Sequence, residues 1–185
     1  IPDRLLAPIM GFGLLLRAMT VPCMAFDTKN EMNEDSSPFA LFKFGFSAYK
    51  NGHKDEAVKA LRFAAEKGHQ GANWKLGRMY AEGDGVKEDD YEAYKMFEQV
   101  IQEGADQGTQ NESYVADALV ALAGYVKRGI PNSPINSNPG AARDLYLQAA
   151  SNFGDPDAQF ELGKMLMRGA GGEASPNQAP RWIRL

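Results

Sequence analysis

Residues 65–97, AEKGHQGANWKLGRMYAEGDGVKEDDYEAYKMF, decide the fold of this chain. The stretch contains one segment with apolar residues at helical spacing, near 71–82, and the start of a second, near 89–103, joined by a glycine-rich turn. In the first segment, Ala72 and Gly77 are small residues five positions apart. Small side chains on an amphipathic helix allow a neighbouring helix to approach closely, as stacked helical hairpins require. The stretch therefore predicts one hairpin of a stacked array.

The pair of small residues occurs four times in the chain, at intervals of 32, 46 and 40 residues. The four pairs are Ala40 and Gly45, Ala72 and Gly77, Ala118 and Ala123, and Ala158 and Gly163. Sequence repeats at intervals of roughly 20–50 residues are typical of solenoids, in which each unit buries its apolar face against the next. We therefore expect four hairpin units.

Helix start and stop signals surround these pairs. A capping residue stands before proline at Ser37-Pro38, Asn138-Pro139, Asp155-Pro156 and Ser175-Pro176. Glycines follow the apolar segments, where the end of a helix favours them. The first helices of the four units are expected at 38–50, 71–82, 112–128 and 156–168. The second helices are expected at 54–67, 89–103 and 139–152, with a fourth beginning near 176. No segment of useful length alternates apolar and polar residues, so the expected fold class is all-α.

Residues 65–97 and the later string GDPDAQFELGKMLMRGAGG at 154–172 resemble Sel1-like repeats, relatives of the tetratricopeptide repeat with a longer turn inside the hairpin. The resemblance implies a right-handed α-solenoid over residues 38–185, with units at about 38–69, 70–104, 112–154 and 155–185. The first unit looks closer to a tetratricopeptide unit. The third departs from the pattern, because Ala123 replaces a glycine and a long loop, GIPNSPINSNPG, follows at 129–140.

The order of segments along the chain resembles that of one particular family of repeat proteins. An apolar N-terminal run, an acidic leader, the string FALFKFGFSAYKNGHKDEAVKALRFAAEKG at 39–68 and then these repeats are similar to the ExoR family of alphaproteobacteria. Proteins of that family are periplasmic negative regulators of exopolysaccharide synthesis that bind the periplasmic domain of a sensor histidine kinase. The resemblance therefore implies a non-enzymatic regulator with such a domain as its partner. Composition and spacing alone indicate only an exported helical solenoid that binds something.

The N-terminus is typical of an exported protein. A 12-residue apolar run at 5–16 follows Arg4, and small residues at Cys23 and Ala25 suit signal-peptide cleavage after Ala25. We expect a signal peptide at 1–25 and a disordered acidic leader at 26–37. The apolar run is shorter than the roughly 20 residues that cross a bilayer, so no stable membrane insertion is expected after cleavage. Cleavage would remove the only cysteine, which suits an oxidising periplasm.

Composition excludes two further classes of protein. The 185 residues include 20 Lys or Arg and 24 Asp or Glu, and the net charge is -4. That balance gives no basic surface for a phosphate backbone, so nucleic acid is not an expected partner. A single cysteine cannot form a disulfide framework within the chain.

Catalytic and metal-binding signals are sparse. His53 and His69 fall in expected turns, where solvent-facing side chains are common, and neither would have a cysteine partner after cleavage. The acidic turn EGDGVKEDDYE at 82–92 lacks the alternating oxygen ligands of an EF-hand loop. Its acidic residues are interpreted as the favourable start of a helix. We therefore expect no catalytic residues, no metal site and no cofactor.

Two other functions remain open from the sequence. The same solenoid could serve as a periplasmic scaffold or adaptor in envelope or polysaccharide assembly. Some cysteine-rich Sel1 proteins have been linked to β-lactam hydrolysis. The absence of a mature cysteine and of a Ser-x-x-Lys motif argues against that activity here.

The first helices of the units carry the candidate binding surface. Aromatic side chains with scattered cations suit an acidic or amphipathic segment of a partner protein. The expected partner-binding residues are Phe39, Phe42, Phe46 and Tyr49 in unit one, Trp74 and Arg78 in unit two, Lys127 and Arg128 in unit three, and Phe160 and Lys164 in unit four. In the alternative interpretation, the aromatic residues of unit one pack under the leader or against the second helix of that unit.

Two expectations concern the loop of unit three and the end of the chain. The loop at 129–140 is a candidate protease site, because its Pro and Asn content leaves little hydrogen-bonded backbone. The chain stops at PRWIRL, residues 180–185, inside the expected second helix of unit four. The last unit is therefore incomplete, and further repeats are expected after it.

Overall fold

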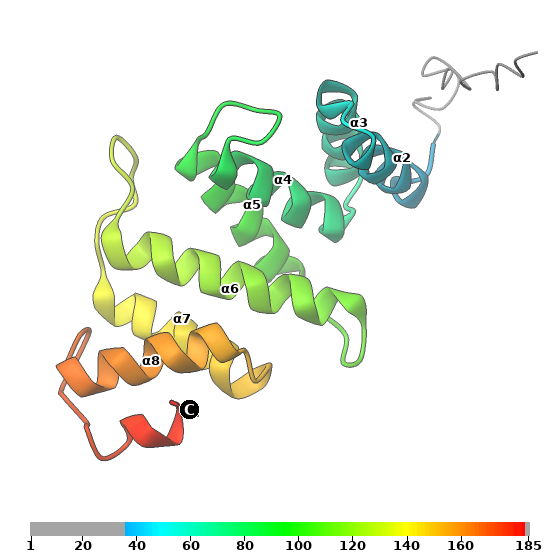
Figure 1. The fold of residues 1–185 in the computed structure, drawn as a ribbon. Coiled ribbons are helices and arrows are strands. Elements are labelled where there is room, and N and C mark those ends of the chain that lie inside the picture. Colours follow the sequence, from blue (N-terminus) through cyan, green and yellow to red (C-terminus); the bar gives the residue numbers. More distant parts are fainter. Residues whose placement is uncertain (1–35, 184–185) are drawn as a thin grey trace, which may run out of the picture.

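The computed structural model describes residues 36–183, and every regular element in that range is a helix (Figure 1). The elements are α2 (Pro38–Lys50), α3 (Lys54–Glu66), α4 (Gln70–Glu82), α5 (Asp90–Glu103), α6 (Gln110–Arg128), α7 (Pro139–Asn152), α8 (Pro156–Arg168) and the short 3-10 helix η1 (Ala179–Arg181). The predicted signal peptide, residues 1–25, and nearly all of the predicted leader, 26–37, lie outside the described residues.

Successive helices form hairpins that stack along the chain. Helices α2 and α3, α4 and α5, and α6 and α7 pair as neighbours, and α8 pairs with η1. Figure 1 shows the hairpins following one another in sequence order, so that each one lies against its neighbours. The expected all-α solenoid of helical hairpins is confirmed.

Local capping explains where most helices begin. The side chain of Ser37 accepts a hydrogen bond from the amide of Ala40, and Asp155 accepts one from Ala158 at 2.8 Å. Asn138 caps α7 in the same way. The fourth expected signal, at Ser175-Pro176, does not begin an α-helix. Residues 176–178 form a turn and η1 follows, because Pro180 lacks the N–H group that a helix beginning at 176 would need one turn later.

The two members of each small pair have different neighbours. Ala72 shares a buried cluster with Leu41 and Leu61 of the preceding hairpin. Gly77 faces its own hairpin partner instead, because a Cβ atom there would lie 2.9 Å from the Phe97 ring. Ala40 departs from the pattern: it is exposed, since no described hairpin precedes α2.

The remaining small residues follow the same division. Ala118 and Ala158 are fully buried with residues of neighbouring hairpins, and Ala123, in place of glycine, is fully buried as well. A Cβ atom at Gly45 would lie 2.9 Å from Leu61 of the partner helix α3. Gly163 faces Ile183, which follows η1 in the position of a partner helix.

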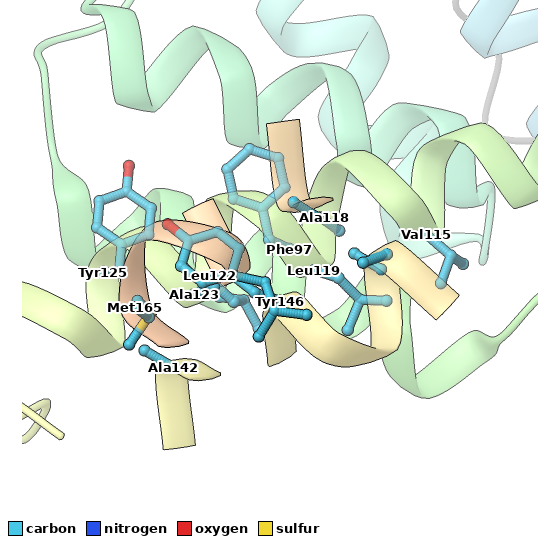
Figure 2. Close-up of a cluster of buried hydrophobic side chains, with 14 of the residues drawn as sticks. Phe97, Val115, Ala118, Leu119, Leu122, Ala123, Tyr125, Ala142, Tyr146 and Met165 are labelled. Atoms are coloured by element: carbon cyan, nitrogen blue, oxygen red, sulfur yellow. The ribbon is translucent and has the colours of Figure 1, made fainter. Parts of the chain in front are cut away.

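The core consists of two clusters that meet at α4. The smaller cluster joins α2, α3 and α4 through Leu41, Leu61 and Leu76. The larger one extends from α5 to η1, and Figure 2 shows its side chains gathered between the helices. Trp74 and Tyr80 of α4 pack against this larger cluster. Helix α4 therefore connects the first hairpin to the rest of the solenoid.

Between residues 36 and 183, none of the helices has both the length and the apolar character needed to cross a membrane.

Candidate protein-binding surface

The first helices of the four hairpins carry equivalent positions on one side, which we call the A face. Counted from the first small residue of each unit, the A-face positions are the residue before it and those two and six places after it. The A face comprises Phe39, Phe42 and Phe46 in α2, Gly71, Trp74 and Arg78 in α4, Asp117, Val120 and Gly124 in α6, and Asp157, Phe160 and Lys164 in α8.

A cleft of about 400 Å³ opens in the A face between α4, α6 and the start of α8. The predicted residues Trp74, Arg78 and Arg128 line it. The cleft exists because α6 has small side chains, Val120 and Gly124, where the other units have aromatic or cationic ones.

The spacing from the small residues also shows which residues of unit one correspond to the predicted cations of unit three. Lys127 lies nine positions after Ala118, as Tyr49 lies nine after Ala40, so Lys127 corresponds to Tyr49 and not to Trp74.

Trp74 is fixed at the wall of the cleft by two neighbours from α6. Its ring stacks on Tyr114 at a centroid distance of 4.8 Å. Its indole N–H donates to the carboxylate of Asp117 at 3.1 Å. Partial burial raises the pKa of Asp117, and this effect outweighs the hydrogen bond from Trp74 and the nearby charge of Arg78. Arg78 lies over the Trp74 ring and pairs with Glu82 at 2.8 Å.

The aromatic residues of α2 are open to solvent to different degrees. Phe39 is 66% exposed, whereas Phe42 is half-buried by stacking on His69 at 4.2 Å. Phe46 lies beside Phe42, with a centroid distance of 5.8 Å. The buried side of α2 carries Phe44 and Gly45. Phe42 packs against the smaller core cluster, which includes Leu61 of α3.

His69 differs from its expected environment. The sequence predicts a solvent-facing turn residue, which describes His53, but His69 is half-buried at the start of α4. Burial lowers its pKa, and its Nδ1 atom has no hydrogen-bond partner. The stacking on Phe42 accounts for its position, because the ring fills the junction between the first two hairpins.

Tyr49 joins the first two hairpins. Its hydroxyl donates to Asp84, a residue of the turn between α4 and α5, and Lys54 also donates to that carboxylate. These two contacts, first that of Lys54 and then that of Tyr49, lower the pKa of Asp84. The Lys75 ammonium lies 3.4 Å from the centre of the Tyr49 ring. Tyr49 is therefore a structural link more than an open binding residue.

The cations of units three and four are paired within the chain. Lys127 contacts Glu161 at 3.0 Å, and Lys164 contacts the same carboxylate at 2.5 Å. Arg128 contacts Asp90 at 3.2 Å. Phe160 is 50% exposed, and the Lys164 ammonium lies 4.7 Å from the centre of its ring.

The sequence prediction did not include Asp117, which belongs to the A face, or Tyr114, which stacks on Trp74. Asp117 has a sequence signal, since it immediately precedes Ala118 as Phe39 precedes Ala40. Tyr114 belongs to the extra first turn of α6 and has no counterpart in the other units. Among residues 36–183, no group of three or more His, Cys, Asp or Glu side chains is placed to hold a metal ion.

Three stretches of the chain, residues 71–104, 116–152 and 156–185, match the family model described as Sel1 repeat. These matches begin after the first hairpin. A crystal structure of a Sel1 repeat protein from Oxalobacter formigenes is similar to this chain, with a TM-score of 0.65 and 25% sequence identity. The similarity covers 78% of this chain and 56% of that one.

Two curated relatives carry the name "Exopolysaccharide production negative regulator". The protein of Rhizobium leguminosarum bv. viciae is 49% identical over 176 residues, and that of Rhizobium meliloti (strain 1021) is 50% identical over 176 residues. Both similarities cover 95% of this chain, which spans 66% of the length of each relative.

Proposed function

This chain belongs to the Sel1 repeat family, and we propose that it acts as a protein-binding negative regulator of exopolysaccharide production. The names and the similarity of the two rhizobial relatives support this role. Both relatives are named as regulators, and these names, together with the Sel1 repeats, support the expectation that the chain is not an enzyme.

The A face is the observation that carries the proposal. It combines exposed aromatic rings, those of Phe39 and Phe160, with a cleft walled by Trp74. Aromatic side chains supply large contact areas with few rotamers to restrict, so they are enriched where proteins bind one another. Stacked helical hairpins also bind their partners along extended surfaces of this kind.

The proposed partner is the periplasmic domain of a sensor histidine kinase, and the proposed compartment is the periplasm. The apolar run at 5–16, followed by small residues before Phe26, supports export. In this proposal, binding along the A face holds the kinase in the state that limits exopolysaccharide production. The chain contributes contacts and no chemistry of its own.

Site-specific photocrosslinking in cells tests this function. A photoreactive amino acid replaces Trp74 in the full-length protein, and a matched variant carries it at Phe63, which is 47% exposed on α3. We expect the position in the A face to capture a sensor-kinase periplasmic domain and the position on α3 not to do so. Capture of envelope-assembly proteins alone would instead support a scaffold.

A second readout connects binding to regulation. Cells that lack the protein should overproduce exopolysaccharide, and the full-length protein should restore normal production. Unchanged exopolysaccharide in cells without the protein contradicts the proposed role.

A further inference from the structure

Unpaired cations on the A-face side of the solenoid are concentrated in its N-terminal part. Lys43, Lys50 and Lys75 have no carboxylate within 4.0 Å among the described residues. Arg78, Lys127, Arg128 and Lys164, near the cleft and on α8, are paired with Glu82, Asp90 or Glu161. Arg168, at the end of α8, is the exception and has no carboxylate within 4.0 Å among the described residues. A partner carboxylate would therefore find most of the free positive charge of the A-face side on α2 and α4.

The distribution of charge along the chain agrees with this difference. Residues 36–83 contain eight Lys or Arg and four Asp or Glu, a net charge of +4. Residues 84–183 contain eight Lys or Arg and fifteen Asp or Glu, a net charge of -7. An acidic ligand is therefore attracted to the N-terminal part and repelled by the remainder, which fixes where it can dock.

The free lysines alternate with aromatic rings along one side of α2. Phe39, Lys43, Phe46 and Lys50 follow one another at helical spacing, over about 16 Å of helix axis. Lys50 lies 5.1 Å from the centre of the Phe46 ring, and Lys75 of α4 covers Tyr49 at the end of the row. We call Phe39, Lys43, Phe46, Lys50 and Lys75 the basic strip.

We propose that the basic strip docks an acidic, apolar segment of the partner protein. Apolar side chains of that segment would cover Phe39 and Phe46, and its carboxylates would pair with Lys43 and Lys50. This inference rests on the proposed function and names the chemistry of the partner at one end of the A face. The cleft beside Trp74 then holds a second, less charged part of the same partner.

The chemistry of the strip favours a protein segment over a polysaccharide. Phe39 and Phe46 offer apolar surface and no hydrogen-bonding group for sugar hydroxyls. The lysines of the basic strip can only donate hydrogen bonds. They therefore suit carboxylates, which only accept them, better than hydroxyl groups, which both donate and accept.

Charge reversal on the basic strip tests the inference. The full-length protein carries Lys43→Glu and Lys50→Glu together, and the control carries Lys59→Glu and Lys87→Glu, two exposed lysines on α3 and in the α4–α5 turn. Both pairs change the net charge equally. Capture of the partner through the crosslinker at Trp74 is measured for each, with helicity and thermal unfolding as controls for folding.

We expect the strip variant to lose roughly tenfold in affinity for the partner, whereas the control changes by less than about twofold. The milder Lys43→Gln and Lys50→Gln pair should give an intermediate loss without changing the fold. Salt should weaken binding of the natural protein more than binding of the strip variant, because screening acts on the lysine–carboxylate pairs.

Several results would overturn the inference. Equal capture by the natural protein and the strip variant removes the basic strip from the interface but leaves the regulator in place. If deleting residues 26–35 and reversing the strip both increase capture, that acidic segment of the chain itself is the occupant. Loss of retention on acidic exopolysaccharide, with partner capture unchanged, assigns the strip to the polysaccharide. Capture of no protein at all overturns the proposed function as well.

Discussion

Gly77 and Gly124 each lie inside the first helix of a hairpin, but their surroundings differ. A Cβ atom at Gly77 would press on the buried Phe97 ring, whereas one at Gly124 would have no neighbour closer than 3.7 Å. We expect Gly77→Ala to lower the free energy of unfolding by about 1–3 kcal/mol, because the packed ring cannot move aside. Gly124→Ala should raise it by about 0.5–1 kcal/mol through helix propensity. Urea unfolding followed by circular dichroism measures both, and equal effects would contradict this contact pattern.

Asp117 provides a pH-dependent prediction at the same scale. The pKa of Asp117 in the folded protein is raised, chiefly by desolvation. At neutral pH the ionised carboxylate therefore destabilises the folded protein relative to the unfolded chain. Asp117→Asn keeps an acceptor for Trp74 and removes this cost, so the variant should be more stable at neutral pH. As pH falls and Asp117 takes up its proton, the advantage should shrink and vanish.

Thermal unfolding between pH 3 and 7 tests this sign, with Asp144→Asn on the exposed side of α7 as the matched control. An advantage for Asp117→Asn that grows as the solution becomes more acidic would contradict the assigned pKa direction.

Helix starts that depend on neighbouring residues in the chain are predictable from the sequence. The starts of α2, α7 and α8 follow from a capping side chain and a proline next to each other in the chain. The cleft depends instead on how α4 and α6 dock. The hydrogen bond from Trp74 to Asp117 joins residues 43 positions apart, and the stacking of His69 on Phe42 also requires two packed hairpins. Such contacts depend on how neighbouring hairpins dock, so the sequence pattern alone does not predict them.

The two long connections should differ in their resistance to proteolysis. The loop after α6 has more hydrogen-bonded backbone than its composition predicts: Ile130 donates to Ile135 at 2.9 Å, and Asn138 donates to Val126 at 2.7 Å. Ile130 is also buried. Residues 105–108, between α5 and α6, are exposed, and their only backbone hydrogen bond is the one that the Thr109 amide donates to the Asp106 carbonyl.

We therefore expect subtilisin to cut within 105–108 faster than within 130–137 under native conditions, because cleavage needs an extended, released backbone. Mass spectrometry of the early fragments identifies the sites. Faster cleavage within 130–137 would instead support the loop at 129–140 as the protease site.

The α4–α5 hairpin contributes to both core clusters: Met96 of α5 packs against the smaller cluster, and Phe97 of α5 belongs to the larger one. Leu76 and Met79 belong to the smaller cluster, and Trp74 packs against the larger one. The Asp84 carboxylate adds a polar link from the α4–α5 turn back to the first hairpin. The basic N-terminal part and the acidic remainder therefore meet at the α4–α5 hairpin, and their mutual orientation depends on its packing.

This arrangement predicts that the solenoid loses structure unit by unit. In a stacked repeat array each hairpin contacts mainly its neighbours, so a local defect weakens the nearest units most. Leu61→Ala, in the smaller cluster, should cost about 2–5 kcal/mol and should reduce amide protection in α2, α3 and α4 while α7 and α8 keep theirs. Leu162→Ala, in the larger cluster, is the matched variant and should show the reverse. Hydrogen exchange measured by mass spectrometry separates the two patterns, and an equal loss of protection in every helix for both variants would show instead that the hairpins unfold as one cooperative unit.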